Sequence, residues 1–257
     1  METNTINKKN MEQKQLLERM RQLKLWGMYH TFQTNLNATL PENLTADELL
    51  SMLIESEWDD RQTRKRDRLI TSAKFRYTAS VEELEYDPER NLDKNQILRF
   101  ADCDYIEQRQ NILITGSTGV GKSYLGCALG HQACLKGYRV MYFNLAKLLS
   151  WLKMMKADGS YLKEIGRLER QDLLILDDFG LQPIDDQSRL IFLEIIEDRY
   201  DRSSTILTSQ LPVSNWYEVI NEKTIADAIL DRLVHRSFRI NLKGESMRKT
   251  RIRTTEN

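Results

Sequence analysis

The sequence is poor in several features that would each mark a particular class of protein. Proline occurs four times and cysteine three times in 257 residues. The three cysteines, Cys103, Cys127 and Cys134, are an odd number without metal-ligand spacing, so we expect buried, reduced thiols rather than disulfides or a zinc site. No apolar run approaches the roughly 18 residues of a membrane-spanning helix. The polar start, METNTINKKNMEQKQ, lacks the apolar core of a signal peptide, so we expect a cytoplasmic protein.

The sequence also has no excess of charge of either sign. It contains 38 basic and 38 acidic side chains, which argues against attraction of nucleic acid by the whole surface but allows a local basic patch. Such a patch follows Asp59 and Asp60, where basic residues between positions 61 and 76 face only Asp67. This cluster is either a DNA-contacting surface or a solvated helix face. The candidate DNA contacts are Arg61, Arg64, Lys65, Arg66 and Arg68.

The first part of the chain reads as a small helical domain, residues 1–78. Apolar residues recur at helical spacing over 11–36. Thr45 with Glu48 three residues later forms a capping-box pattern that predicts the start of another helix. Residues 79–95 have no periodicity, and we expect them to be a linker.

From residue 96 the pattern changes to alternating strands and helices. Short apolar runs predict strands at 112–114, 140–143, 173–176, 205–208 and 238–242. Helices are predicted at 122–136, 145–156, 161–169, 186–200 and 224–236. Apolar strands that alternate with helices are typical of a parallel sheet covered on both faces, so residues 96–257 are expected to form an α/β domain.

The stretch LITGSTGVGKSYLG, residues 113–126, predicts a phosphate-binding loop. It fits the pattern G-x-x-x-x-G-K-[ST] between a strand and a helix. The glycines let backbone N–H groups point at phosphate oxygens, and the helix presents its positive end to the same anion. Lys122 would reach the β- and γ-phosphates, and the Ser123 hydroxyl would ligate Mg²⁺. The expected nucleotide contacts in this stretch are Gly116, Ser117, Thr118, Gly119, Val120, Gly121, Lys122, Ser123 and Tyr124.

Two carboxylates at the end of another predicted strand complete this site. Asp177 follows Leu173–Leu176 and is the candidate Mg²⁺ ligand, acting through water because Mg²⁺ dehydrates reluctantly. Asp178 would lie where an attacking water must be polarised. The expected cofactors are therefore ATP and Mg²⁺.

The order of the predicted strands favours the additional-strand class of P-loop ATPases, which includes the AAA+ proteins. One strand, 139–143, intervenes between the phosphate loop and the strand of Asp177. In this class the strand at 205–208 lies between the other two, so its end would face the γ-phosphate. Thr208, Ser209 or Gln210 could sense hydrolysis there, and Ser209 is the selected candidate.

Two arginines near the C-terminal end are further candidates. Arg232, late in a predicted helix, could reach the γ-phosphate of a neighbouring subunit, or it could pair with Asp227 or Asp231 on its own surface. Arg248 could approach the nucleotide of its own subunit, or it could belong to a solvated basic tail.

Taken together, five stretches resemble the IstB-type transposition helper ATPases, AAA+ proteins close to the DnaC helicase loaders. They are GSTGVGKSYLGCALGHQACLKGYRVMYFN, DLLILDDFG, RSSTILTSQLPVSNWYEVI, AILDRLVHRS and LKGESMRK. The likeness covers about residues 96–250, and the helical N-terminal part resembles the family more loosely. Many relatives carry Asp-Glu where this chain has Asp177-Asp178, so the reach of Asp178 to a lytic water is one methylene shorter.

The resemblance implies a homo-oligomer, a ring or spiral, that assembles on duplex DNA with ATP bound. It implies a partner transposase, Arg232 as arginine finger, Arg248 as second sensor, and hydrolysis that is slow and acts as a switch. No base-reading motif is evident, so DNA recognition is expected to be largely independent of sequence. A DnaC-like helicase loader is the alternative. A small-molecule kinase is disfavoured, because no acceptor signature is present.

Overall fold

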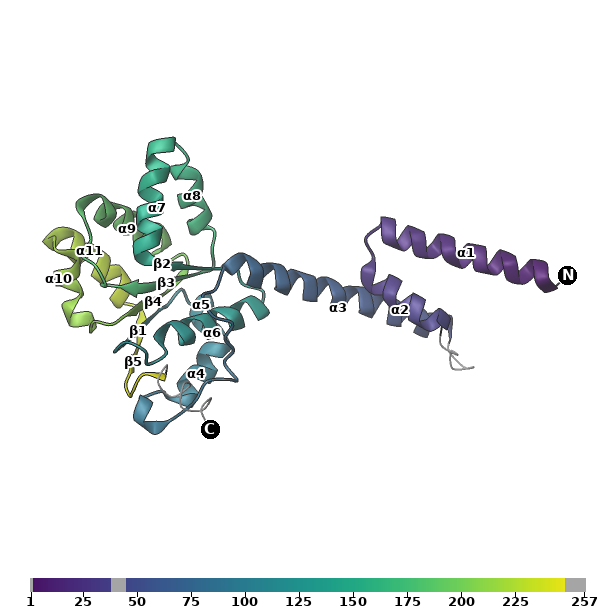
Figure 1. Ribbon diagram of the computed structural model, residues 1–257, viewed down its shortest axis with the longest axis horizontal. Helices are drawn as coiled ribbons and strands as arrows, with labels where there is room; N and C mark the ends of the chain where they lie inside the picture. The colour runs from purple at the N-terminus through teal and green to yellow at the C-terminus, as the bar shows by residue number, and fades with distance from the viewer. Residues whose placement is uncertain (1, 38–44, 248–257) are drawn as a thin grey trace, which may run out of the picture. The chain divides into compact units, whose positions relative to one another are not determined.

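Two structural units divide the chain. The computed structural model describes residues 2–37 and 45–247, and the units are Met1–Asp67 and Arg68–Asn257. The division falls inside a helix rather than at residue 78, where the sequence pattern suggested a boundary. In the N-terminal unit the described elements are helices: α1 (Glu2–Gln22), α2 (Trp26–Asn37) and the first part of α3 (Ala46–Ala73) (Figure 1).

Helix α3 begins with the capping box that the sequence predicts. The Thr45 backbone N–H donates to Glu48 Oε2 (2.8 Å), and the Glu48 backbone N–H donates to Thr45 Oγ1 (3.3 Å). Two of the backbone donors that a helix start leaves without partners are thereby satisfied. Helix α2 packs on α3 through Gly27, whose N–H donates to Glu57 Oε2 at 2.9 Å.

The second unit is built on a parallel sheet of five strands in the order β2-β3-β4-β1-β5. Strand β4 lies between β1 and β3, as expected for the additional-strand class of P-loop ATPases. The carboxyl ends of β1, β3 and β4 therefore meet at one edge. The strands are β1 (Asn111–Gly116), β2 (Val140–Asn144), β3 (Leu173–Phe179), β4 (Ser204–Ser209) and β5 (Ser237–Leu242).

Helices cover both faces of this sheet, which confirms the predicted fold class. Successive strand residues point to opposite faces, so Ile112 and Ile114 enter one apolar core and Leu113 enters the other. Figure 1 shows α4 and α6 on one side of the sheet and α7, α8 and α9 on the other. The helical elements are η1 (Pro88–Arg90), α4 (Lys94–Ala101), α5 (Asp104–Glu107), α6 (Lys122–Leu135), α7 (Leu145–Asp158), α8 (Tyr161–Glu169), α9 (Asp186–Arg199), η2 (Val213–Asn215), α10 (Trp216–Ile220) and α11 (Lys223–Val234).

Residues 79–95 are part of the second unit and not the free linker that their lack of periodicity suggested. Ala79, Val81, Leu84 and Leu92 are buried in the core that α6 shares with β1. Apart from the short η1 and the start of α4, this segment is irregular and shows no helical or strand periodicity, yet single apolar side chains anchor it.

The three cysteines lie in the interior, as predicted. Cys103, Cys127 and Cys134 are free thiols with no exposed surface. Over the described ranges, none of the helices combines the length and the apolar character that a membrane crossing requires.

Candidate nucleotide-binding site

The loop between β1 and α6 has the backbone shape that a phosphate loop needs. Gly116 has φ +147° and Gly121 has φ +95°, a region that side chains with a Cβ rarely adopt. A Cβ at Gly116 would also lie 2.3 Å from the carbonyl oxygen of Leu242. The loop therefore depends on glycine at both ends, and α6 starts directly after it at Lys122.

The lysine and serine of this loop point inward. Lys122 is 5% exposed, and its Nζ donates to the carbonyl oxygen of Ser117 at 2.8 Å, which closes the loop on itself. Ser123 Oγ donates to Asp177 Oδ1 at 2.8 Å. Residues 54 positions apart thus meet at the carboxyl edge of the sheet, as the sequence predicted.

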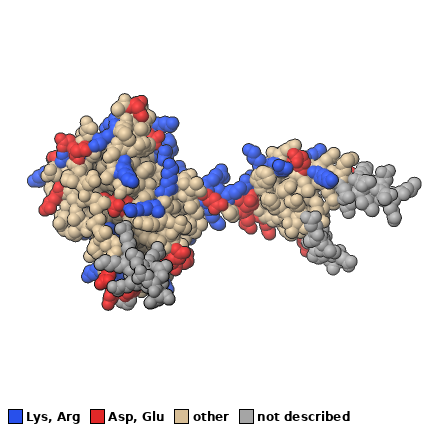
Figure 2. Space-filling view, viewed as in Figure 1, with Lys and Arg blue, Asp and Glu red and all other residues tan. Residues whose placement is uncertain are grey.

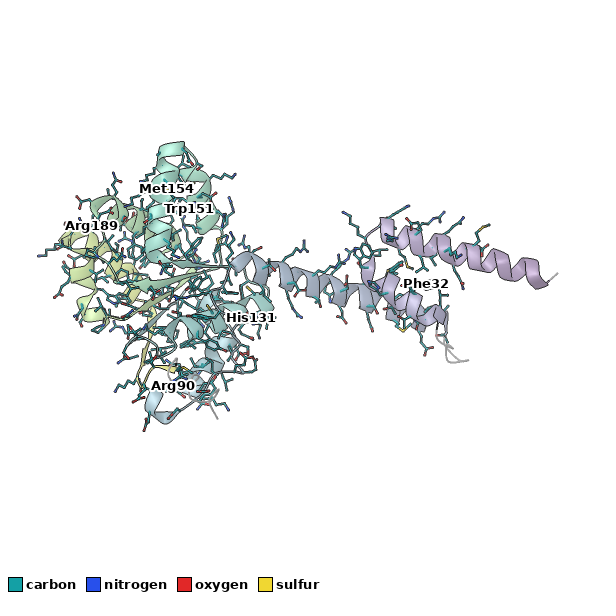
Figure 3. The ribbon with its side chains drawn as sticks, viewed as in Figure 1. Phe32, Arg90, His131, Trp151, Met154 and Arg189 are labelled. Carbon is teal, nitrogen blue, oxygen red and sulfur yellow. The ribbon has the colours of Figure 1, made fainter. Side chains whose placement is uncertain are left out.

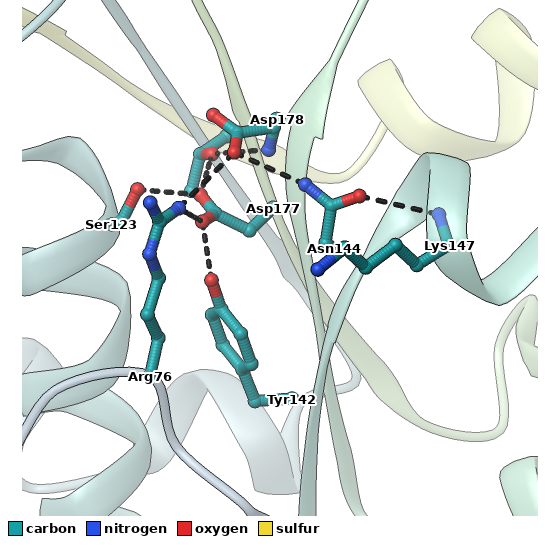
Figure 4. Close-up of polar contacts among 8 residues, drawn as sticks. Arg76, Ser123, Tyr142, Asn144, Lys147, Asp177 and Asp178 are labelled. Atoms are coloured by element: carbon teal, nitrogen blue, oxygen red, sulfur yellow. Dashed lines mark hydrogen bonds and ion pairs between the residues drawn. The ribbon is translucent and has the colours of Figure 1, made fainter.

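Asp177 is a fully buried carboxylate surrounded by donors (Figure 4). Its Oδ1 accepts from Ser123 and from Thr208 Oγ1, and its Oδ2 accepts from the Tyr142 hydroxyl and from Arg76. Burial, together with the hydrogen bond to Asp177 and its negative charge, raises the pKa of Tyr142, so the phenol remains a donor. These contacts hold both carboxylate oxygens in place at the ends of the strands, where they can bind a cation or a metal-bound water.

Asp178 stands on a bulge of β3 and points toward the pocket. Its φ is +63°, and the register of β3 against β4 shifts between Leu176 and Phe179. The backbone N–H of Asp178 donates to Thr208 Oγ1 at 3.1 Å. Strained backbone of this kind is concentrated at functional sites, where the surrounding structure maintains it.

Two donors hold the Asp178 carboxylate. Asn144 Nδ2 donates to Asp178 Oδ2 at 3.1 Å, and Arg76 Nη1 lies 3.2 Å from the same oxygen. Asn144 is itself fixed, because its Oδ1 caps α7 by accepting from the Lys147 backbone N–H. Asp178 is therefore restrained by side chains from two other segments of the chain (Figure 4).

The polar end of β4 lies beside this site, but Ser209 does not point into it. Ser209 is fully buried, and its hydroxyl donates to the carbonyl oxygen of Phe179 and accepts from the Leu211 backbone N–H. The selection of Ser209 as a nucleotide contact is corrected, because strand alternation turns its side chain away. Its neighbours face the site instead: Thr208 contacts Asp177, and Gln210 Oε1 accepts from Thr118 Oγ1 at 2.7 Å.

A cavity of about 300 Å³ opens beside the phosphate loop, a volume at the lower end of the range for small-molecule pockets. Its lining includes Lys122, Ser123 and Asp178. It also includes Leu84 and other residues of the segment 79–95, for which the sequence predicts a linker. Tyr124 contributes its hydroxyl, which donates to Glu83 Oε2 at 2.7 Å.

Arg90 fastens this segment to the phosphate loop (labelled in Figure 3). Its Nη2 donates to the carbonyl oxygen of Val120 at 2.9 Å, and its Nη1 donates to that of Glu85 at 2.8 Å. The carbonyl oxygen of Arg90 accepts from the Lys243 backbone N–H. The guanidinium, which lines the cavity, thus joins residues 85 and 120 of two different loops.

Arg232 lies on α11, away from the cavity. It is 28% exposed and pairs with Glu197 at 2.9 Å, while its Nη1 donates to the carbonyl oxygen of Ala228. Within its own chain Arg232 therefore pairs with neither Asp227 nor Asp231, the partners that the sequence offered. Arg248, the other candidate arginine, lies outside the described residues.

The basic cluster of α3 is partly neutralised by acidic neighbours. Arg61 pairs with Glu57 at 2.6 Å, and Arg64 pairs with Glu57 and Asp60. Lys65, Arg66 and Arg68 are exposed. Figure 2 shows both Lys or Arg and Asp or Glu side chains on the visible face.

Among the residues that contact the two carboxylates, Arg76, Tyr142 and Asn144 were not predicted. Asn144 carries a usable signal, because it is a polar residue directly after a predicted strand. Tyr142 lies within the predicted strand and was interpreted as apolar. Arg76 belongs to a run of basic residues and has no local signal, because its contacts with Asp177 and Asp178 are about a hundred residues away.

The residues present fit a magnesium–nucleotide complex. Ser123 and Asp177 supply oxygen ligands at one point, and the other ligands of Mg²⁺ in such sites are phosphate oxygens and water. In the described part of the chain, no group of three or more His, Cys, Asp or Glu side chains that could hold a metal ion is present.

Comparison with known families supports the assignment of a nucleotide site. Residues 18–255 match the family described as IstB-like ATP binding protein. An insertion sequence ATP-binding protein of Sinorhizobium fredii, y4pL, is 44% identical over 237 residues, which cover 92% of this chain and 97% of that protein. The insertion sequence IS21 ATP-binding protein of Pseudomonas aeruginosa is 30% identical over 226 residues, covering 88% of this chain and 85% of the relative.

Solved structures share the fold of the second unit. The DnaC helicase loader aligns with a TM-score of 0.57 at 22% identity, over 66% of this chain and 100% of the loader. At this identity the likeness concerns the fold. The parallel sheet with its phosphate loop is thus that of the AAA+ proteins.

Proposed function

The chain belongs to the IstB-like ATP binding protein family, and on that premise we propose that it is an ATP-controlled, DNA-binding regulator of DNA transposition. It is an ATPase with the AAA+ fold. In the proposed function it oligomerises on duplex DNA with ATP bound and recruits or activates a partner transposase. The names of its relatives, which are insertion sequence ATP-binding proteins, support the link to transposition, and the cytoplasm is the proposed compartment.

The observation that carries the ATPase part is the meeting of Lys122, Ser123, Asp177 and Asp178 at one edge of the sheet. Lys122 would contact the β- and γ-phosphates, and Ser123 with Asp177 would hold Mg²⁺. The metal ion would neutralise charge that develops on the phosphate oxygens. Asp178 would accept a proton from the attacking water.

Slow hydrolysis is the second element of the proposal. Asp178 Oδ2 accepts from Asn144 and from Arg76, and these two contacts restrain the movement of the carboxylate toward an attacking water. A restrained base would slow proton transfer, which suits a timed switch rather than a fast motor.

The proposed assembly joins subunits through Arg232. Its pair with Glu197 is partly exposed, with Glu197 48% accessible, and such pairs contribute only about 0–1 kcal/mol. Arg232 can therefore exchange Glu197 for the γ-phosphate of a neighbouring subunit at little cost.

The exposed members of the basic cluster on α3 would contribute contacts to DNA phosphates, which carry no sequence information.

The test measures DNA binding and particle size together, on a duplex of several helical turns, with no nucleotide, ADP, ATP or a non-hydrolysable ATP analogue. Assembly with ATP on arbitrary duplex is expected for the wild type. It should be lost in Lys122→Ala and Arg232→Ala, but retained in the control Arg202→Ala, whose side chain is 69% exposed. The triple variant Arg64→Ala, Lys65→Ala, Arg66→Ala should weaken binding and reduce its salt dependence.

Two outcomes would contradict the proposal. Assembly that is unchanged in Arg232→Ala would remove its role across subunits. Absence of duplex binding in every nucleotide state would favour the alternative, a DnaC-like helicase loader in replication, and a hexameric protein partner would then be sought.

A further inference from the structure

Arg76 occupies a fixed place at the edge of the nucleotide site although it belongs to the segment that follows α3. The helix ends at Ala73, which is fully buried, and Lys74 turns the chain with φ +55°. Phe75 then packs against α6, so closely that a Cβ at Gly130 would lie 2.7 Å from its ring. These anchors directly before Arg76 fix its backbone, and its side chain reaches the ends of the strands.

One terminal nitrogen of Arg76 reaches both carboxylates of the site (Figure 4). Nη1 lies 3.5 Å from Asp177 Oδ2 and 3.2 Å from Asp178 Oδ2. The three side chains differ in exposure: Asp177 is fully buried, Asp178 is 18% exposed and Arg76 is 42% exposed. The guanidinium therefore covers the carboxylates from the side of the solvent.

Two adjacent carboxylates at low exposure need a positive partner. An uncompensated charge in a protein interior is strongly destabilising, and a second like charge beside it adds to the cost. A bound Mg²⁺–nucleotide complex would bring this positive charge, but before it binds the compensation must come from the chain. Arg76 supplies it from a position that can be vacated, because its long side chain reaches solvent.

We propose that Arg76 is the resident counter-ion of Asp177 and Asp178 in the nucleotide-free chain and that it competes with Mg²⁺ for them. This inference rests on the proposed function of the site as a Mg²⁺–ATP site. Binding of the metal–nucleotide complex displaces the guanidinium from the carboxylates, and Asp178 loses one of its two restraints at the same moment. Arg76 is thus a positioning residue that couples metal binding to the release of Asp178.

An ordinary structural ion pair would not behave in this way. Arg139 makes such a pair with Asp172 at 2.8 Å, and it is similarly exposed at 55%. Arg139 precedes β2 and lies at the amino edge of the sheet, remote from the phosphate loop. It therefore provides a matched control, because its replacement removes an arginine–aspartate pair without touching the site.

The experiment measures the Mg²⁺ concentration that half-saturates binding of a fluorescent ATP analogue, with the full chain, at saturating analogue and without DNA. Arg76→Gln removes the competitor, so the half-saturating Mg²⁺ concentration should fall roughly five- to tenfold. A change of this size corresponds to the loss of one partly exposed ion pair. Arg139→Gln should leave it unchanged. Arg76→Lys keeps the charge but not the planar fork, and it should fall between the wild type and Arg76→Gln.

A second readout does not depend on nucleotide affinity. Arg76→Gln should lower the melting temperature of the nucleotide-free chain, and the difference from wild type should shrink when Mg²⁺ and the analogue are saturating. If Arg76→Gln does not fold, the test is whether the half-saturating Mg²⁺ concentration of Arg76→Lys lies below that of the wild type.

An unchanged or raised Mg²⁺ requirement in Arg76→Gln, with analogue binding retained, would overturn the inference. A raised requirement would mean that Arg76 assists the metal or phosphate rather than competing with it. Failure of the wild type to bind the analogue in a Mg²⁺-dependent manner would instead contradict the proposed Mg²⁺–ATP site itself, so the two failures are distinguishable.

Discussion

Asp177 and Arg199 are charged residues that the fold buries completely or nearly so, and the surroundings of each explain how it is tolerated. Asp177 accepts from four side chains. Arg199 is 2% exposed and donates to the carbonyl oxygens of Leu168, Gln171 and Ser204. Buried charges are stable when hydrogen bonds replace the lost hydration. The two residues differ in their roles: Asp177 lies at the nucleotide site, whereas Arg199 joins the end of α8 to the start of β4.

Replacement of Arg199 by Met should destabilise the second unit by about 3–5 kcal/mol. The loss arises because several buried carbonyl oxygens would be left without donors, although the methionine fills part of the volume. The free energy of unfolding in urea, followed in the full chain, measures this effect.

Arg202→Met is the matched control for this prediction. Arg202 is 69% exposed and pairs with Glu169 at 3.3 Å, so its replacement should change the free energy of unfolding by less than about 0.5 kcal/mol. Equal effects of the two substitutions would show that the buried hydrogen bonds of Arg199 contribute little.

At the scale of elements, the contact between α2 and α3 depends on the absence of a side chain. A Cβ at Gly27 would lie 2.2 Å from the carbonyl oxygen of Ser56 and 2.6 Å from the Cα of Glu57. Both atoms belong to the backbone of α3, so a side-chain rotation cannot relieve the overlap. Close helix packing at this point is thus fixed by a single glycine, and it also brings the Gly27 N–H to Glu57.

Gly27→Ala should destabilise the packing of the N-terminal unit by about 1–2 kcal/mol. Alanine favours helix by about 1 kcal/mol over glycine, but overpacking typically costs about 1–3 kcal/mol, and here the backbone of α3 would have to move. Amide hydrogen exchange in α2 should accelerate roughly tenfold as a result.

The control for Gly27 is Gly166 in α8. There a Cβ would meet only the Arg170 side chain at 3.8 Å, so Gly166→Ala should be neutral or stabilise the chain by up to about 1 kcal/mol. Destabilisation by Gly166→Ala, or none by Gly27→Ala, would contradict this account of the two helices.

At the scale of the whole molecule, two apolar cores on opposite faces of the sheet make the second unit cooperative. The three thiols report on the core that α6 shares with β1, because all three belong to it. Burial raises the pKa of Cys103 and of Cys127 to about 11 and that of Cys134 to about 12. In the folded chain these groups are protonated at pH 8, and the reactive thiolate is scarce.

A thiol-specific reagent at pH 8 should therefore label the folded chain at least about 100-fold more slowly than the denatured chain, in which all three cysteines react. Saturating nucleotide should slow labelling further if it binds the folded state.

The thiol pKa is higher in the folded than in the unfolded state. The contribution of the protonated thiols to the free energy of unfolding is therefore fully present below about pH 9, and it is lost as the pH rises through about 11 to 12.

The time course of reagent absorbance, read against a denatured sample, measures this prediction. Rapid labelling of one thiol in the native chain would mean that the core around it opens independently of the rest. Labelling of all three cysteines that is equally fast with and without denaturant would contradict the burial of the three thiols in the folded chain.

The sequence by itself determined the elements of the second unit and the core of its site. Strands of continuous apolar residues and the glycine-lysine-serine loop have local causes, namely burial on both faces and backbone conformation. Gly121, Lys122, Ser123 and Asp177 were predicted correctly as neighbours in space, because carboxyl ends of parallel strands meet at one edge of the sheet. The place of β4 between β1 and β3 followed from the class of P-loop ATPase that the pattern favours.

Only the tertiary structure decided which other side chains surround the carboxylates. Arg76 follows α3, whereas Tyr142 and Asn144 lie on β2, and contacts over such sequence distances leave no periodicity to detect. The direction of Ser209 depended on the register of one strand, where a shift of one residue reverses every side chain. Residues 79–95 gave no signal of structure, because an irregular segment is held by the core against which it packs and not by its own pattern.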